Sequence, residues 1–318
     1  MAQAFIAPVI GTVTVGAFSS EAMIQAGIRS RNTVGLDDDA IYDRYRADNR
    51  RVYGADLADM NYFSVGATGW EGRIGSLEGW LVRAGRYGDP TLAVEPRGHE
   101  GYALFRDSAA MRRLRGAFHR ATAQGITVWV RFASECNLEG SAFSVYDSAA
   151  RQKAFRHAAA WFRDYMGVRI VCSPLINTPY MAQRVGEWRQ IRTMRSLLEP
   201  GLWDRIGGTI YATDPRNYGT LEQMWGWWVN FVREYDPYTP LQICELGAPI
   251  RAIERREGVV RFLADIGSGR WQGVEKINLF AGAVNGRLQQ THGDYGFIAP
   301  GNRESYLKHR FWKDKNNT

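Results

Sequence analysis

Short apolar runs alternate with longer amphipathic stretches along almost the whole chain. The runs are rich in β-branched and aromatic residues, as buried strands are, and their starts fall about 30 to 48 residues apart. The eight strand candidates are 13–18, 61–66, 91–96, 127–133, 169–174, 208–212, 241–245 and 276–281. This spacing is typical of a strand followed by a loop, a helix and a second loop.

Four of the intervening stretches have helical spacing of their apolar residues, at 39–53, 108–122, 147–166 and 220–235. Ser108 has the side chain of an N-cap, and Gly167 follows the third stretch as a stop signal. Trp225 and Trp228 share one face of the fourth stretch. We therefore expect these tryptophans to pack against the body of the protein rather than to bind a ligand.

Eight strands that alternate with helices predict an α/β fold of the (β/α)8 TIM barrel type in a single domain. We expect the barrel to span residues 12–312, after an apolar arm at 1–11 and before a polar tail at 313–318. A doubly wound open sheet is the alternative. That fold favours a glycine-rich phosphate loop after the first strand, and the sequence Phe18-Ser-Ser-Glu-Ala-Met is not one.

Composition narrows the class of protein further. The 318 residues are 45% hydrophobic, 13% aromatic and 23% charged, which excludes a disordered, collagen-like or disulfide-scaffold chain. The net charge of +7 comes from 40 Lys and Arg against 33 Asp and Glu, yet only five of the cations are lysines. Scattered arginines without a run of like charge argue against a nucleic-acid partner.

The sequence argues against disulfide, metal and cofactor sites, and against a membrane span or a signal peptide. Three cysteines without a CxxC pair exclude a disulfide framework and a zinc ribbon, and we expect no metal and no cofactor. No uncharged apolar stretch reaches the length of a membrane span. The apolar N-terminal segment lacks the basic start of a signal peptide, so we expect a protein made in the cytoplasm. We expect such a protein to leave the cell within a phage particle or after lysis.

Two carboxylates end apolar strand candidates, where packing gives no reason for a charge. Glu135 follows the fourth candidate, in ITVWVRFASE, and Glu245 ends the seventh, in LQICE. The C-terminal ends of the strands carry the reacting groups in TIM barrels. Two carboxylates across a barrel mouth suit glycoside hydrolysis, in which one protonates the leaving oxygen and the other attacks the anomeric carbon.

This arrangement resembles the retaining clan of (β/α)8 glycoside hydrolases, and most closely family 26, the family of β-mannanases. The family reads Arg-Pro-Tyr-His-Glu-Met-Asn-Gly after its fourth strand, and this chain reads Arg131-Phe-Ala-Ser134-Glu135-Cys-Asn137-Leu. Four further segments are similar in order along the chain. They are the segment around Trp70, the CSPLIN segment that ends in Asn177, the strand that ends in Tyr211, and Asp294-Tyr295 near the C-terminus.

The resemblance implies retaining endo-hydrolysis of a β-linked polysaccharide, with Glu135 as acid/base and Glu245 as nucleophile. It also implies a substrate-binding shell, and aromatic side chains at strand ends suit stacking on sugar rings. The residues expected to bind substrate are Trp70, Arg131, Ser134, Asn137, Asn177, Tyr211 and Phe280. Tyr211 is expected to hold the nucleophile ionised, together with Arg131.

Ser134 stands where the family has a histidine, which predicts a wider site and poor action on plain mannan. Arg97 and Arg216 on strand-end loops would suit an acidic glycan, such as one on a bacterial surface, or would simply be solvated at the rim. The alternative function is an inactive, carbohydrate-binding barrel associated with a virion or a host surface.

Overall fold

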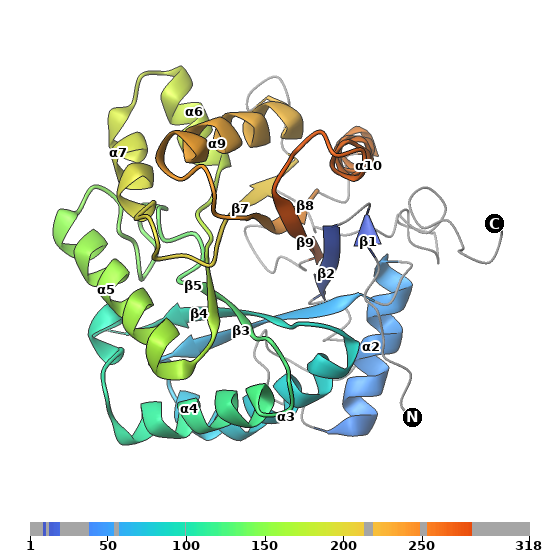
Figure 1. Ribbon diagram of the computed structural model, residues 1–318, viewed down its shortest axis with the longest axis vertical. Helices are drawn as coiled ribbons and strands as arrows, with labels where there is room; N and C mark the ends of the chain where they lie inside the picture. The colour runs from blue at the N-terminus through green and yellow to red at the C-terminus, as the bar shows by residue number, and fades with distance from the viewer. Residues whose placement is uncertain are drawn as a thin grey trace.

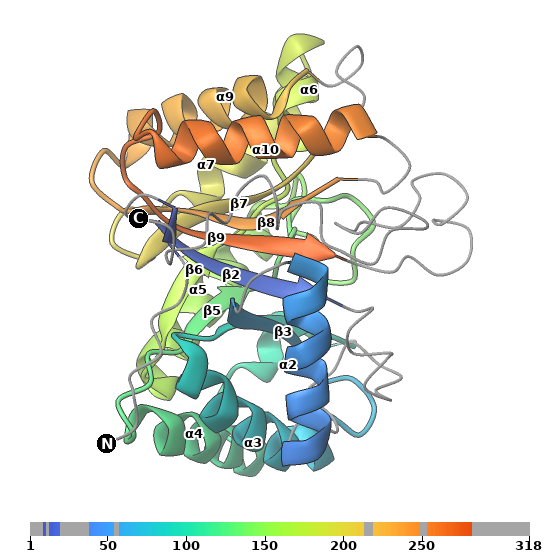
Figure 2. The same cartoon turned by 90° about the vertical axis from the view of Figure 1, so that its right-hand side faces the viewer.

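Eight parallel strands close into a barrel in the computed structural model, which describes residues 9–10, 13–19, 38–53, 57–98, 100–212, 219–248 and 253–281. Each strand pairs with the next one in the chain, and β2 pairs with β9 to close the ring (Figures 1 and 2). The barrel strands are β2 (Val13–Ser19), β3 (Ala58–Val65), β4 (Thr91–Pro96), β5 (Trp129–Phe132), β6 (Arg169–Cys172), β7 (Arg205–Tyr211), β8 (Leu241–Gly247) and β9 (Val274–Ala281). The predicted TIM barrel is confirmed.

Helices surround this barrel and connect its strands (Figure 1). The described helices are α2 (Asp39–Tyr53), α3 (Ile74–Ala84), α4 (Ala109–Thr122), α5 (Ala149–Met166), α6 (Asn177–Arg184), α7 (Trp188–Leu197), α9 (Leu221–Tyr235) and α10 (Ile253–Gly267). Short 3-10 helices precede and follow α3, at η1 (Trp70–Arg73) and η2 (Gly85–Tyr87), and another precedes α4, at η3 (Gly101–Leu104). None of the described helices has the length and apolar character needed to cross a membrane.

Local signals in the sequence explain where several helices begin and end. The Ser108 side chain accepts a hydrogen bond from the Met111 backbone N–H, which caps α4 as predicted. Gly167 ends α5 with a left-handed backbone at φ 66°, a conformation that glycine adopts without steric cost. Thr220 and Gln223 form a reciprocal capping box at the start of α9.

The strands follow the apolar runs, although they differ in detail. Each of the eight predicted runs overlaps one barrel strand. β5 and β6 are shorter than their runs, and β2, β3, β7, β8 and β9 extend beyond theirs. Two residues of the expected N-terminal arm form β1 (Val9–Ile10), which pairs antiparallel with β2. Two helices, α6 and α7, rather than one, connect β6 to β7.

An aromatic layer packs between the barrel and the helices on its α4–α5 side. The ring of Phe132 on β5 contacts Phe105, Phe155 and Phe162, at centroid distances of 4.8, 5.9 and 5.5 Å. On the opposite side Trp225 and Trp228 of α9 are fully buried in the core, as their spacing predicts. This continuous apolar shell fixes the barrel strands and hence the side chains at their ends.

The barrel interior is polar near its N-terminal end. Lys276 on β9 is buried and donates a hydrogen bond from Nζ to the backbone carbonyl of Asp89, at 2.7 Å. The guanidinium of Arg205 lies 3.5 Å from the ring centroid of Trp129 in the same region. Burial, reinforced by the positive charge of Arg205, lowers the pKa of Lys276 from 10.5 to about 7.

This buried lysine makes stability depend on pH. Because the folded state binds its proton more weakly than the unfolded chain does, raising the pH from about 7 to 10.5 favours folding. We expect Lys276→Met to remove a rise in the free energy of unfolding of up to about 1.4 kcal/mol per pH unit over this range, measured by urea denaturation. The matched control is Lys153→Met on the exposed side of α5. An unchanged pH dependence in Lys276→Met would contradict the assignment.

Candidate active site

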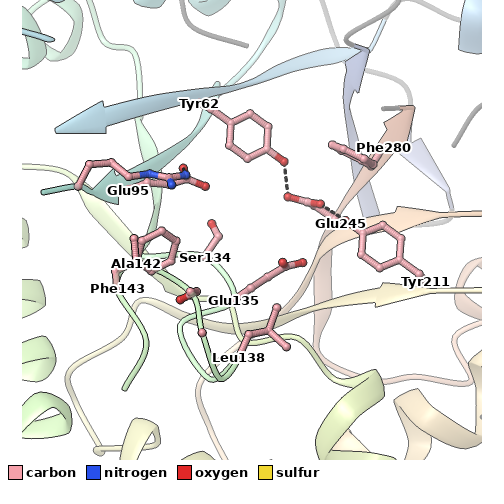
Figure 3. A pocket seen from close by; sticks show the side chains of 13 residues that line it. Tyr62, Glu95, Ser134, Glu135, Leu138, Ala142, Phe143, Tyr211, Glu245 and Phe280 are labelled. Atoms are coloured by element: carbon pink, nitrogen blue, oxygen red, sulfur yellow. Dashed lines mark hydrogen bonds and ion pairs between the residues drawn. The ribbon is translucent and has the colours of Figure 1, made fainter. Parts of the chain in front are cut away.

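A cavity of about 500 Å³ opens among the C-terminal ends of the strands and the loops that follow them (Figure 3). Glu135 and Glu245 both line it, and both carboxylates point into the same space. The other lining residues are Tyr62, Glu95, Arg97, Ser134, Leu138, Gly140, Ser141, Ala142, Phe143, Tyr211 and Phe280. The two glutamates singled out from the sequence are thus brought together at the mouth of the barrel.

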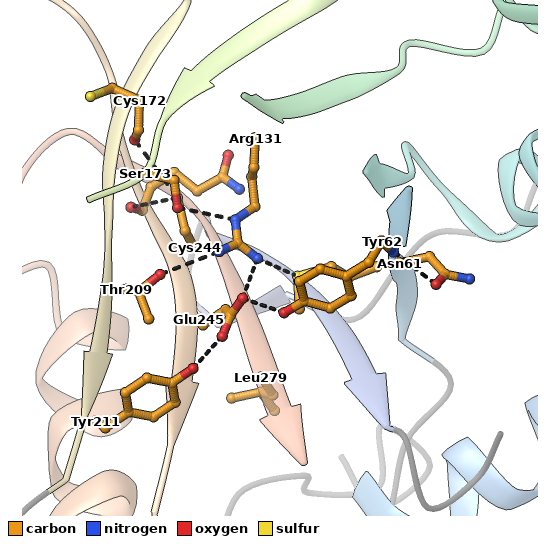
Figure 4. Close-up of polar contacts among 12 residues, drawn as sticks. Asn61, Tyr62, Arg131, Cys172, Ser173, Thr209, Tyr211, Cys244, Glu245 and Leu279 are labelled. Atoms are coloured by element: carbon orange, nitrogen blue, oxygen red, sulfur yellow. Dashed lines mark hydrogen bonds and ion pairs between the residues drawn. The ribbon is translucent and has the colours of Figure 1, made fainter. Parts of the chain in front are cut away.

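Glu245 on β8 is held by donors from three other strands (Figure 4). Its carboxylate is 4% exposed and lies 2.6 Å from Nη1 of Arg131 on β5. The hydroxyl groups of Tyr62 on β3 and Tyr211 on β7 donate hydrogen bonds to its two oxygens. These donors satisfy both oxygens of the carboxylate and fix its orientation toward the cavity.

Arg131 is fully buried inside the barrel, and each of its donor groups has a partner. Nε donates to Oγ of Ser173 at 3.1 Å, and Nη2 donates to Oγ1 of Thr209 at 3.3 Å. Burial is the largest single influence and would lower the pKa of Arg131. The charge of Glu245, its hydrogen bond to the guanidinium, and the nearby Tyr62 and Cys244 together outweigh burial and raise the pKa well above its ordinary value. The guanidinium therefore stays charged and fixes the orientation of the Glu245 carboxylate.

The two tyrosines beside Glu245 keep their protons. Burial is the largest cause that raises the pKa of Tyr62 and of Tyr211 well above the ordinary value, and the charge of Glu245 raises both further. The charge of Glu135 contributes to the shift of Tyr211 as well, which places both carboxylates near that hydroxyl. The two tyrosines are therefore hydrogen-bond donors throughout the pH range in which proteins fold.

Glu135 is presented by an unusual stretch of backbone just beyond β5. Ala133 and Glu135 both have left-handed backbones, with φ of 50° and 59°. The backbone N–H of Glu135 donates to the carbonyl of Ser173 at 2.8 Å, which ties this turn to β6. Non-glycine residues in this conformation cost about 1–3 kcal/mol each and cluster at functional sites.

Two of the predicted substrate-binding residues are buried and hold the loops of the site. Asn137 donates to the backbone carbonyl of Leu175 at 2.9 Å and accepts from its N–H at 2.8 Å. Asn177 makes the same pair of bonds with the backbone of Tyr211, at 2.9 and 3.1 Å. Neither asparagine lines the cavity. Asn177 holds Tyr211, which does, and Asn137 ties the loop that carries Glu135 to Leu175.

The remaining predicted residues divide between the cavity and its surroundings. Ser134 and Phe280 line the cavity, and the ring of Phe280 meets Tyr211 edge-on at a centroid distance of 6.0 Å. Trp70 begins η1, packs edge-on against Phe63 at 6.3 Å and is not among the lining residues. Arg216, Asp294 and Tyr295 lie outside the described residues.

Tyr62 and Glu95 are not among the residues expected from the sequence. Glu95 is the next-to-last residue of the apolar strand β4 and so lies near a strand end, as Glu135 and Glu245 do; the same criterion would have identified it. Arg97 Nη2 lies 2.6 Å from this carboxylate. Tyr62 sits within a strand and has no comparable local signal.

The described residues provide no support for a cysteine nucleophile or for a metal site. Cys136, Cys172 and Cys244 are buried and unpaired, and burial raises the pKa of each thiol. A buried, protonated thiol is a poor nucleophile. Within the described part of the chain no group of three or more His, Cys, Asp or Glu side chains has the arrangement of a metal site.

Comparison with known proteins finds likeness in structure alone. No family model matches the sequence, and no curated protein matches it significantly. A β-mannanase from a symbiotic protist of the termite Reticulitermes speratus, solved with a gluco-manno-oligosaccharide, has a TM-score of 0.53 at 13% identity, over 96% of this chain and 88% of its own. A β-glucosidase solved without ligand has a TM-score of 0.50 at 15% identity, over 76% and 78%. The chain therefore shares the barrel fold of solved glycoside hydrolases, a β-mannanase among them.

Proposed function

We propose that this protein is a retaining glycoside hydrolase that cleaves a β-linked polysaccharide. Glu245 acts as the nucleophile and Glu135 as the acid/base. The observation that carries this proposal is the pair of carboxylates in one cavity, one of them fixed by Arg131, Tyr62 and Tyr211. The barrel fold shared with solved β-mannanase and β-glucosidase structures supports the same class of reaction.

The different surroundings of the two carboxylates suit the two roles. Glu245 is buried, and a guanidinium and two phenolic hydroxyls hold its carboxylate in one orientation, as attack on a single carbon atom requires. Glu135 is partly exposed on the loop side of the cavity, where it can reach a leaving group that departs toward solvent. Retaining enzymes place such carboxyl groups about 5–5.5 Å apart, and we propose this separation here.

The proposed reaction has two steps. Glu245 attacks the anomeric carbon while Glu135 gives its proton to the glycosidic oxygen, so the leaving sugar departs as an alcohol and a covalent glycosyl ester forms. Glu135, now ionised, takes a proton from water, and the resulting hydroxyl attacks the same carbon and releases Glu245. Glu245 loses its negative charge when the glycosyl ester forms and regains it when the ester is hydrolysed. Arg131 and the two tyrosines stabilise the carboxylate as it is released in the second step.

Reducing-sugar release from a panel of β-linked polysaccharides tests this function. Release of oligosaccharides from any member of the panel supports endo-hydrolysis. Tight binding to a polysaccharide without any release would instead favour the carbohydrate-binding alternative. The panel includes β-1,4-mannan, glucomannan, β-glucans and acidic glycans, because the sequence departs from the mannanase pattern at Ser134.

Amide variants of the two glutamates are expected to lose turnover. We expect Glu245→Gln to lower kcat by at least about 10³-fold, because the amide is a poor nucleophile. Glu135→Gln is expected to lower kcat by about 10²–10⁴-fold on a polysaccharide and far less on an aryl glycoside whose leaving group needs no proton. Glu187→Gln, outside the cavity where Glu187 accepts a hydrogen bond from Tyr146, is the matched control. Near-normal turnover of either cavity variant would refute the assignment.

Removing one donor from the nucleophile is expected to have a smaller effect. Tyr211→Phe deletes the hydroxyl bonded to Glu245 and leaves the ring against Phe280. A hydrogen bond to a charged group is worth about 1.5–3 kcal/mol, so kcat/KM should fall by roughly 10- to 150-fold. Tyr165→Phe, which deletes a surface hydroxyl on α5, is the control. The same loss in both variants would point to stability rather than to the site.

A further inference from the structure

Two serine hydroxyls line the cavity without a hydrogen-bond partner. Ser134 is 4% exposed, and within the described part of the chain neither its Oγ nor the buried Oγ of Ser141 has a protein partner. Buried hydroxyls in folded proteins are nearly always hydrogen-bonded. These two hydroxyls beside one cavity are therefore candidates for hydrogen bonds with a bound group.

Ser134, Ala142 and Phe143 lie on a wall of the cavity across from Glu245 (Figure 3). We call it the serine corner, formed by Ser134, Gly140, Ser141, Ala142 and Phe143. A Cβ added at Gly140 would meet no atom within 4 Å, and Ala142 adds only a methyl group, so no bulky side chain fills the corner at these two positions. The ring of Phe143 and the methyl group of Ala142 supply apolar surface next to the hydroxyls.

The corner is held in place before any ligand binds. The Tyr102 hydroxyl donates to the carbonyl of Phe143 at 2.5 Å, and the N–H of Val145 donates to the carbonyl of Cys136 at 2.8 Å. Phe143 is also packed under the guanidinium of Arg97, 5.4 Å from the ring centroid. A preformed wall loses little conformational freedom on binding and can therefore discriminate between ligands.

The charges beside the corner cancel. Arg97 is paired with Glu95 at 2.6 Å, and Glu95 is only 14% exposed. A carboxylate on the substrate would have to compete for Arg97 and leave Glu95 unpaired, in a cavity that already holds Glu135 and Glu245. A neutral group that accepts hydrogen bonds fits this corner better than an anionic one.

We propose that the serine corner binds an acyl substituent of the sugar, so that the substrate is a glycan carrying O-acetyl or N-acetyl groups. This inference rests on the proposed function for the position of the sugar. The carbonyl oxygen of the acyl group accepts hydrogen bonds from Ser134 and Ser141, and its methyl group lies against Ala142 and Phe143. Glu95 disfavours acidic sugars, because its ion pair with Arg97 occupies the guanidinium that a carboxylate of the substrate would need.

Matched oligosaccharides test this proposal by binding and by turnover. The first pair is an O-acetylated β-1,4-mannan oligosaccharide and the same preparation after alkaline deacetylation. A β-1,4-linked N-acetylglucosamine oligosaccharide distinguishes the N-acyl source, and a β-1,4-mannuronate oligosaccharide supplies the acidic arm. Binding is measured by calorimetry with Glu135→Gln, and turnover with the unmodified protein.

We expect about tenfold or greater preference for an acylated oligosaccharide over the deacetylated and acidic ones. Ser134→Ala and Ser141→Ala should each reduce this preference about fivefold, as the loss of one neutral hydrogen bond does. Ser144→Ala, in the same loop but outside the cavity lining, should keep it. A fall of equal size on acylated and deacetylated ligands in the serine variants would overturn the proposal.

Other outcomes distinguish failure of the serine-corner proposal from failure of the proposed hydrolase function. Equal affinity for acetylated and deacetylated oligosaccharides, or preference for mannuronate, would refute the serine corner even if all are cleaved. Preference in binding without any cleavage would refute the hydrolase and support the corner. The absence of binding and of cleavage with every oligosaccharide would overturn both.

Discussion

The buried ion pair between Arg131 and Glu245 is the interaction on which the site depends. Removing two charges from water is costly, and a buried pair is tolerated only when its remaining hydrogen-bonding groups are satisfied. Tyr62 on β3, Thr209 and Tyr211 on β7, and Ser173 just after β6 supply these partners. Breaking such a pair by removing one member costs about 3–5 kcal/mol, so the ring of strands and the nucleophile are energetically linked.

The second carboxylate depends on a different constraint. Glu135 lies on a turn with two left-handed residues, held by a backbone hydrogen bond to the β6 side and by the Asn137 bonds to Leu175. Packing fixes Glu245, whereas loop geometry fixes Glu135. This difference gives one carboxylate a buried, cationic environment and the other access to solvent, as the division into nucleophile and acid/base requires.

Much of this arrangement follows from local sequence. Alternating apolar runs and amphipathic stretches determine a barrel, and strand-end carboxylates in an apolar context mark Glu135 and Glu245 because nothing in packing requires them there. Partners across the barrel cannot be predicted in this way. Tyr62 meets Glu245 only because strand register and closure bring β3 opposite β8, and Asn137 and Asn177 turn toward loop backbones rather than the cavity.

Trapping of the covalent intermediate tests the central claim most directly. A 2-deoxy-2-fluoro glycoside of the cleaved sugar, with a good leaving group, should slow the second step and add one fluoroglycosyl group to the protein, detected by mass spectrometry of the intact chain. Peptide mapping should place the adduct on Glu245, and Glu245→Gln should not acquire it. An adduct on another residue, or hydrolysis with inversion at the anomeric carbon, would contradict the account.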